Sequence, residues 1–124
     1  VGDYQMFANE RDNKNYDIFV GGWFSDYNDP LDFLNVMKTG VYDSYGLYSN
    51  SEYDSLIDSL TGENDNAKRL EIYQKLEDLL VAQDCGVAPL YYSDKHYYYQ
   101  NWVKDFYTSS FGASQELYRA SVQK

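Results

Sequence analysis

Hydrophobic residues recur at intervals of three and four positions in several stretches of the chain, the spacing that gathers them on one face of an α-helix. The stretches are residues 3–12, 29–40, 51–62 and 67–83. In the second and third, a polar residue suited to an N-cap begins the stretch and a glycine ends it. The last stretch has a wide apolar set, which predicts burial against two neighbours: Leu70, Ile72, Tyr73, Leu76, Leu79 and Leu80.

Shorter apolar stretches have the composition of β-strands. Residues 16–20 are apolar on both faces after Asp17, which favours a strand in a sheet that is covered on both sides. Residues 87–92 predict a second buried strand, and residues 117–122 predict a third. Residues 40–50 follow neither period, so we expect an irregular, tyrosine-rich connection there.

The composition narrows the classes of partner. A chain of 124 residues has the length of one domain, and its 20 acidic against 10 basic residues give a formal charge of −10. This charge disfavours nucleic acids and anionic membranes as partners, whereas cationic or zwitterionic ligands are easier to accommodate. The single cysteine, Cys85, excludes an intramolecular disulfide and a multi-cysteine metal site. The 15 tyrosines suit wet, aromatic-lined surfaces.

Residues 21–30, Gly-Gly-Trp-Phe-Ser-Asp-Tyr-Asn-Asp-Pro, have the most informative local composition. The glycines let another backbone come close, Trp23 and Phe24 supply aromatic surface, and Asp26 supplies a carboxylate. Asp29 is placed as the N-cap of the next helix. Two interpretations have equal weight: a ligand-binding loop, or a strand-to-helix connection whose aromatic residues pack in a core.

Catalytic and metal sites find little support in the sequence. Asp26 and Asp29 resemble a glycosidase carboxylate pair, but capping accounts for Asp29 and no second strong acid candidate is present. The ligand spacing of a helix-loop-helix calcium site is absent. His96 is the only histidine, which gives no basis for a histidine metal site or a Ser-His-Asp triad. We therefore expect no enzyme, no cofactor and no metal.

Recognition of a positive group is the functional interpretation that remains. A carboxylate at Asp26, partly shielded by Trp23, offers charge-assisted hydrogen bonds to an ammonium group. The glycines let an extended ligand pair with the main chain as an added strand does, which describes peptide binding. A competing interpretation is an aromatic-rich carbohydrate-binding or surface-adhesion module, in which aromatic rings stack on sugars.

Several stretches of the chain carry a family resemblance: 16–18, 22–30 with Phe33 and Leu34, 48–54, 69–80, and 87–92 leading to Trp102 and Val103. In this order they resemble the C-terminal part of the oligopeptide-binding proteins, the family 5 solute receptors of peptide ABC importers. The resemblance implies an α/β fold class: part of a two-lobed, periplasmic-binding-protein-like (type II) fold with a mixed sheet and flanking helices. It also implies a receptor that grips the main chain of an extended peptide.

The resemblance implies roles for individual residues. Asp26 resembles the carboxylate that holds the α-amino group of the peptide. Gly22 and Phe24 resemble residues whose backbone pairs with the peptide, and Trp23 lies between them in the same loop. Arg11 falls where some members place a basic residue for the C-terminal carboxylate of the ligand, although the apolar stripe of its helix also explains it.

Two departures from the family pattern leave preferred peptide length and C-terminal recognition open. Val20 stands where certain members carry another arginine for the peptide carboxylate, and Ser93 replaces a third consecutive tyrosine. The family is also much longer than this chain, so we expect a C-terminal fragment. We expect residues 1–90 to belong to the peptide-gripping second lobe and residues 91–124 to return to the first lobe.

The implied partners are an oligopeptide and, through the full-length protein, the membrane permease of an ABC importer, with no nucleic acid. The implied location is the extracellular face of the cell membrane or the periplasm, with a lipid anchor on the full-length protein. Apolar faces that the full protein covers favour self-association of the fragment as an oligomer or a swapped dimer.

Overall fold

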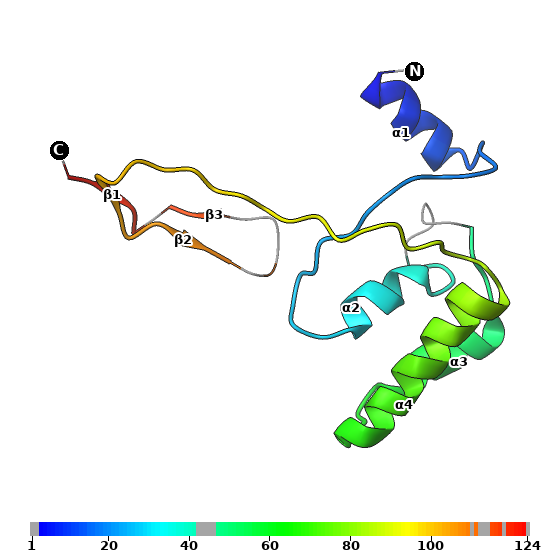
Figure 1. Ribbon diagram of the computed structural model, residues 1–124. Coiled ribbons are helices and arrows are strands. Elements are labelled where there is room, and N and C mark those ends of the chain that lie inside the picture. Colours follow the sequence, from blue (N-terminus) through cyan, green and yellow to red (C-terminus); the bar gives the residue numbers. More distant parts are fainter. Residues whose placement is uncertain (1–2, 42–46, 110, 112–114, 118, 124) are drawn as a thin grey trace. The chain divides into compact units, whose positions relative to one another are not determined.

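The computed structural model describes residues 3–41, 47–109, 111, 115–117 and 119–123 (Figure 1). These residues divide into two compact units. Unit 1 contains the chain up to Trp23 and then Asp29–Pro89, and it holds all the helices of the described residues. Unit 2 contains Phe24–Asn28 and the described residues from Leu90 onward, and it holds the strands.

The first helix, α1 (Tyr4–Asp12), confirms the prediction for residues 3–12. Asp3 is its N-cap, and the Asp3 carboxylate accepts a hydrogen bond from the Met6 amide at 2.8 Å. Asn13 is its C-cap, and Lys14 then turns the chain with a left-handed φ of 58°.

The second predicted helix forms as an α-helical turn, α2 (Leu31–Leu34), which continues as a 3₁₀ turn, η1 (Asn35–Met37). The Leu34 carbonyl accepts a hydrogen bond from the Tyr53 hydroxyl at 2.8 Å. The Lys38 amide, which an α-helix would direct to Leu34, donates instead to the Asn35 carbonyl at 3.2 Å. The helix thus tightens at the point where the Leu34 carbonyl accepts from the tyrosine hydroxyl. Gly40, at a φ of 77°, follows its end as predicted.

The third helix, α3 (Ser51–Ser59), is capped one residue earlier than the sequence predicts. Asn50, not Ser51, is the N-cap, because its side-chain oxygen accepts from the amides of Glu52 at 2.8 Å and Tyr53 at 3.1 Å. Ser51 is the first helical residue.

The fourth helix, α4 (Asn66–Glu77), runs on into a π-helical segment, η2 (Asp78–Gln83), which confirms the predicted span 67–83. Asp65 is its N-cap. Beyond its end, Cys85 has a left-handed φ of 51°, and the next residue, Gly86, allows close packing. A Cβ at Gly86 would lie 2.6 Å from a ring carbon of Tyr48 and 3.1 Å from a methyl carbon of Leu80.

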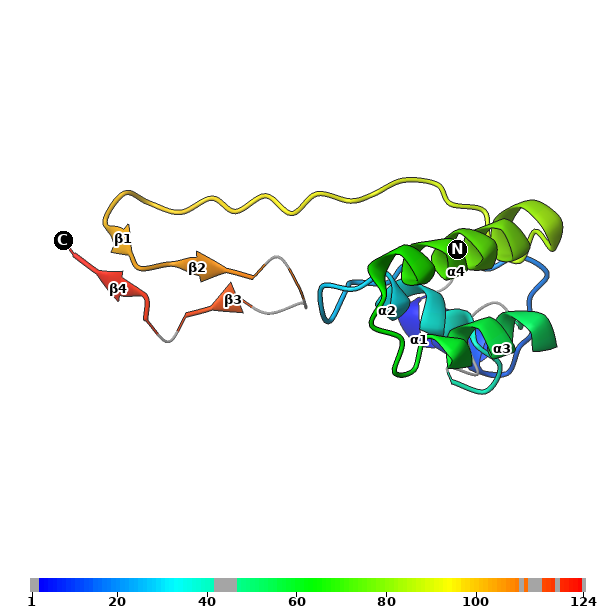
Figure 2. The ribbon, with the colours of Figure 1, turned by 90° about the horizontal axis from the view of Figure 1, so that it is seen from below.

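The core of unit 1 lies among α2, η1, α3, α4 and η2 (Figure 2). The apolar stripes of these helices meet there, so the helical periodicity of the sequence correctly predicts most of the core. The buried hydrophobic residues are Leu34, Val36, Met37, Tyr53, Ile57, Leu60, Leu76, Leu79 and Leu80.

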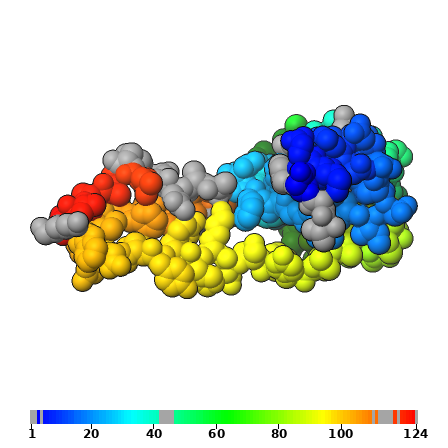
Figure 3. Space-filling view, turned by 90° about the horizontal axis from the view of Figure 1, so that it is seen from above, coloured from blue at the N-terminus to red at the C-terminus, as the bar shows by residue number. Residues whose placement is uncertain are grey.

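Unit 2 contains short antiparallel strand pairs. One pair joins β1 (Val103–Lys104) to β4 (Ser121–Val122), and the other joins β2 (Tyr107–Thr108) to β3 (Gln115–Glu116). Residues 90–100 precede them without regular secondary structure and expose many side chains, seen in yellow in Figure 3. The most exposed tyrosines of this run are Tyr91, Tyr92 and Tyr98.

The strands predicted at residues 16–20 and 87–92 are wrong for this structure, and the strand predicted at 117–122 is reduced to β4. An apolar stretch becomes a strand only where another strand pairs with it. In residues 16–20 the Phe19 ring stacks on Phe7, with centroids 5.5 Å apart. The predicted irregular connection 40–50 falls partly on residues 42–46, which lie outside the described residues.

Candidate functional site

The loop of residues 21–30 is divided between the two units. Gly21, Gly22 and Trp23 group with unit 1, residues 24–28 group with unit 2, and Asp29 belongs to unit 1 again. Of the predicted ligand-binding residues, Gly22, Trp23 and Arg11 therefore lie in unit 1, whereas Phe24 and Asp26 lie in unit 2.

Trp23 is anchored in unit 1. Its half-buried side chain packs against the core, and its indole nitrogen donates to Oδ2 of Asp32 in α2 at 3.4 Å. Asp32 is 6% exposed, and among the residues that the structure describes it is the one charged residue that is buried. A buried carboxylate needs hydrogen-bond donors, so the indole contact serves the fold at this point. Sequence reasoning missed Asp32 because it looks like an ordinary acidic residue in the first turn of a helix.

The two glycines before Trp23 differ in their surroundings. A Cβ at Gly21 would lie 2.3 Å from a ring carbon of Phe19, so a larger residue there would displace the Phe19 ring. A Cβ at Gly22 would meet nothing within 4 Å. Gly22 therefore leaves the space beside its backbone open, as the ligand-binding interpretation requires.

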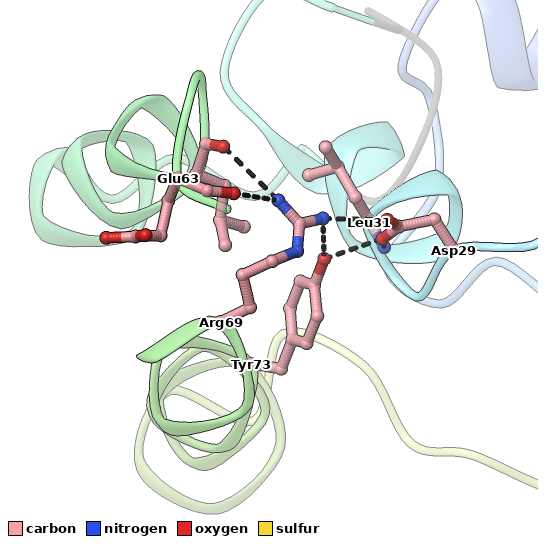
Figure 4. A network of polar contacts seen from close by, with 6 residues as sticks. Asp29, Leu31, Glu63, Arg69 and Tyr73 are labelled. Atoms are coloured by element: carbon pink, nitrogen blue, oxygen red, sulfur yellow. Dashed lines mark hydrogen bonds and ion pairs between the residues drawn. The ribbon is translucent and has the colours of Figure 1, made fainter. Parts of the chain in front are cut away.

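At the other end of the loop, Asp29 is the centre of a polar network within unit 1 (Figure 4). Its Oδ1 accepts hydrogen bonds from the Leu31 amide at 2.9 Å and from the Tyr73 hydroxyl at 2.6 Å. Its Oδ2 forms an ion pair with Nη2 of Arg69 at 2.7 Å. The Leu31 contact supports the capping role predicted for Asp29, but α2 begins only at Leu31, so Pro30 holds its N-cap position and is not the first helical residue. The contacts with α4 add a tertiary role to Asp29.

Arg69 connects this network to the connection between α3 and α4. Its Nη1 donates to the backbone oxygens of Glu63 at 3.1 Å and Leu60 at 3.4 Å. The same guanidinium donates to the Tyr73 hydroxyl, and its central carbon lies 5.4 Å from the Tyr73 ring centroid. Arg69 and Tyr73 are four residues apart on α4 and thus share one helix face. That spacing was a signal in the sequence, but nothing local identified Asp29 as their partner.

The charge states of the network follow from these contacts. Partial burial by itself raises the pKa of Asp29, but hydrogen bonds from Tyr73 and Leu31 and the charge of Arg69 outweigh it and leave the pKa below its ordinary 3.8. Burial and the hydrogen bond to Asp29 raise the pKa of Tyr73 to about 12. At neutral pH Asp29 is therefore an acceptor and Tyr73 a donor.

Within unit 2, Phe24 contributes to a hollow of about 330 Å³. The Lys95 ammonium lies 4.5 Å from the Phe24 ring centroid, a cation–π arrangement. Hydroxyl groups, one carboxylate, one lysine side chain and two aromatic rings line the hollow, so it is suited to a small polar group. Its lining residues are Phe24, Ser25, Ser93, Asp94, Lys95, Tyr97, Thr108 and Ser109.

The remaining predicted residues are placed as follows. Asp26 lies in unit 2 with an exposed side chain. Arg11 lies on α1 and forms an ion pair with Asp12 at 2.7 Å. Over the ranges that the structure describes, no group of histidine, cysteine, aspartate and glutamate side chains is arranged to hold a metal ion. In the same ranges, no helix has the length and apolar character needed to cross a membrane.

No protein-family model matches the chain. Individual relatives do. The chain is 30% identical to the periplasmic oligopeptide-binding protein OppA of Salmonella typhimurium over 82% of its own length. It is also 30% identical to the oligopeptide-binding protein OppA of Bacillus subtilis over 83% of its length. The chain belongs to the oligopeptide-binding protein family. It spans 18% of the length of each of these two relatives.

A solved structure of this family supports the fold. The crystal structure of a periplasmic oligopeptide-binding protein from Borrelia burgdorferi (OppAIV) is 40% identical to the chain and superposes with a TM-score of 0.59. The match covers 68% of this chain and 17% of the Borrelia chain. The predicted family and the predicted α/β periplasmic-binding-protein fold class are therefore confirmed over the matched part. The ligand-binding roles of Gly22, Trp23, Phe24, Asp26 and Arg11 stay predictions.

Proposed function

We propose that this chain is part of the substrate-binding component of an ABC importer that captures extended oligopeptides. The observation that carries the proposal is the similarity to oligopeptide-binding proteins along 82% of the chain. Because the chain spans 18% of such a relative, the function belongs to a longer protein, called the full-length receptor below. The relatives are binding proteins, which agrees with the expected absence of catalysis.

Asp26 is the proposed partner of the α-amino group of the peptide. The two aspartates of the loop differ in exposure: the Asp26 side chain is exposed, whereas Asp29 is partly buried beside Arg69 and Tyr73. An exposed carboxylate offers charge-assisted hydrogen bonds to an ammonium group. The acidic balance of the chain, with a formal charge of −10, also favours a positive group over an anion.

Backbone groups of Gly22 and Phe24 are the proposed partners of the peptide main chain. The open space beside Gly22 supports this assignment, since pairing with a ligand strand needs close backbone approach. Trp23 lies between them as a packed anchor of the loop. Arg11 is assigned to the peptide carboxylate on the family resemblance alone, and its contact with Asp12 is compatible with a structural role instead.

The wider context is proposed from the same family membership. Residues 1–90 belong to the second lobe and residues 91–124 return to the first lobe. The grouping of residues 29–89 apart from residues 90 onward supports this boundary, whereas residues 24–28 group with the later part of the chain. The Salmonella relative is named as periplasmic, which supports a periplasmic or extracellular location here. The lipid anchor, the permease partner and self-association of the isolated chain belong to this proposal.

Calorimetry on the full-length receptor tests the central assignment. Asp26→Asn is expected to weaken binding of a peptide with a free amino terminus by about tenfold or more, since it removes a hydrogen-bonded charge pair. The same variant should leave affinity for the N-acetylated peptide within about twofold of wild type. Equal loss for both peptides would contradict the assignment. Binding of oligosaccharides but not peptides would favour the carbohydrate-binding alternative.

A further inference from the structure

The carboxylate of Asp29 is held more extensively than a helix cap requires. Capping needs only the contact between Oδ1 and the Leu31 amide at 2.9 Å. Two additional side chains, Arg69 and Tyr73, reach it from α4 at 2.7 and 2.6 Å. Arg69 is itself held by the Glu63 carbonyl at 3.1 Å. Both oxygens of Asp29 are thereby engaged, which defines its orientation as well as its position.

Asp29 is also the residue at which the chain re-enters unit 1 after residues 24–28. On the other side of that segment, Trp23 packs against the core and donates to the buried Asp32. The segment that carries Asp26 is therefore bounded at both ends by residues with tertiary anchors in unit 1. A short segment with both ends held has few accessible conformations, and the entropy of ordering it is lost on folding, not on ligand binding.

We propose that Arg69 and Tyr73 are positioning residues for the ligand-binding loop, because they hold Asp29 and so define where the segment 24–28 ends. The consequence for peptide capture rests on the proposed role of Asp26. A carboxylate that binds a ligand is preorganised only when neighbouring residues on rigid elements hold its loop in place. For Asp26, the proposed supporting residues are Arg69 and Tyr73 on α4. If the network only held α2 against α4, its loss would leave the mobility of residues 24–28 unchanged.

Hydrogen–deuterium exchange in the full-length receptor separates these two roles. Tyr73→Phe removes the hydroxyl that donates to Asp29, and Arg69→Lys keeps the charge but removes the fork of donors. Tyr48→Phe is the matched control, since it removes a hydroxyl that donates at 2.7 Å to Asp84, a different aspartate of unit 1 outside the loop. The amides of residues 24–28 are the reporters.

Tyr73→Phe and Arg69→Lys are expected to speed amide exchange at residues 24–28 by about three- to tenfold, which corresponds to the free energy of one hydrogen bond. Tyr48→Phe should leave exchange at these residues unchanged. Unchanged exchange in both loop variants overturns the proposal, and so does an equal rise in Tyr48→Phe, which would show general loosening. Peptide binding is measured in parallel. If the loop variants exchange faster but Asp26→Asn binds the peptide as wild type does, the positioning role of Arg69 and Tyr73 stands and the assigned role of Asp26 is refuted.

Discussion

The Tyr73 hydroxyl donates a hydrogen bond to Asp29 at 2.6 Å across 44 positions of sequence. It connects the start of α2 to the middle of α4, and Arg69 strengthens the connection with an ion pair at 2.7 Å. The ion pair requires the ionised form of the partly buried Asp29 carboxylate, and the hydrogen bond from Tyr73 is stronger to that form, so protonation of Asp29 weakens both contacts.

This dependence predicts a specific loss of stability in acid. The pKa of Asp29 in the folded protein lies below its ordinary 3.8, so the folded state binds its proton less readily than the unfolded state. The stabilisation is therefore complete well above pH 3.8 and is lost as the pH falls below that value. Urea unfolding at about pH 7 should show Asp29→Asn less stable than wild type by about 1–3 kcal/mol, and the difference should shrink near about pH 3.

Asp26→Asn provides the matched control for the acid experiment. Its side chain is exposed in the same loop, so the substitution should change the free energy of unfolding by less than about 0.5 kcal/mol at neutral pH. A gap between Asp29→Asn and wild type that stays constant from neutral to acid pH would mean that the network does not depend on the Asp29 charge.

The guanidinium of Arg69 is predicted to contribute more to stability than the neighbouring ammonium of Lys68. Arg69→Met leaves the Asp29 carboxylate without its ion pair, at a side chain only 31% exposed, and should cost about 1–3 kcal/mol. Lys68 is 65% exposed and lies 3.9 Å from Glu63, so Lys68→Met should cost less than about 0.5 kcal/mol. Similar unfolding midpoints for the two variants in urea would count against the network.

The features of the fold that the sequence predicts are the local ones. Helix spans follow from apolar periodicity and polar caps within a few residues, as α1 and α4 illustrate. The failed strand at residues 16–20 shows the limit, because strand formation depends on a distant pairing neighbour that no local pattern identifies. For the same reason the capping role of Asp29 was predictable, whereas its contact with Arg69, 40 positions away, was not.

The site divides in the same way. The order Gly-Trp-x-x-Asp identified the loop and the family, because that information is contained in consecutive residues. The support beneath the loop comes from α2 and α4, and it appears only when the helices pack. Trp23 illustrates the difference. From the sequence we expect its indole to shield the Asp26 carboxylate, and the structure adds a hydrogen bond from the indole to the buried Asp32.

The buried hydroxyl of Tyr53 is predicted to stabilise unit 1 by its bond to the Leu34 carbonyl. The Tyr53 side chain is fully buried, and the hydroxyl lies 2.8 Å from that oxygen. Tyr53→Phe should cost about 1–3 kcal/mol in urea unfolding, since a buried acceptor loses its partner. Tyr92 is 99% exposed, so Tyr92→Phe should have an effect below about 0.5 kcal/mol. Equal effects would show that the Leu34 carbonyl finds another donor.

The last prediction concerns two glycines with opposite surroundings. Gly86→Ala places a Cβ 2.6 Å from the Tyr48 ring, which is held in place by a 2.7 Å hydrogen bond to Asp84. Relieving the overlap should cost about 1–3 kcal/mol. Gly22→Ala meets nothing within 4 Å and should leave the free energy of unfolding within about 0.5 kcal/mol of wild type.

In the full-length receptor, Gly22→Ala should lower peptide affinity more than Gly86→Ala, the opposite of their effects on stability. The methyl group of Gly22→Ala occupies space that the ligand backbone is proposed to approach, so affinity should fall although stability does not. Gly86→Ala should lower the unfolding midpoint and leave affinity of the remaining folded protein close to wild type. Normal peptide binding by the Gly22→Ala receptor would show that the ligand backbone does not approach Gly22, and Gly22 would then not belong to the site.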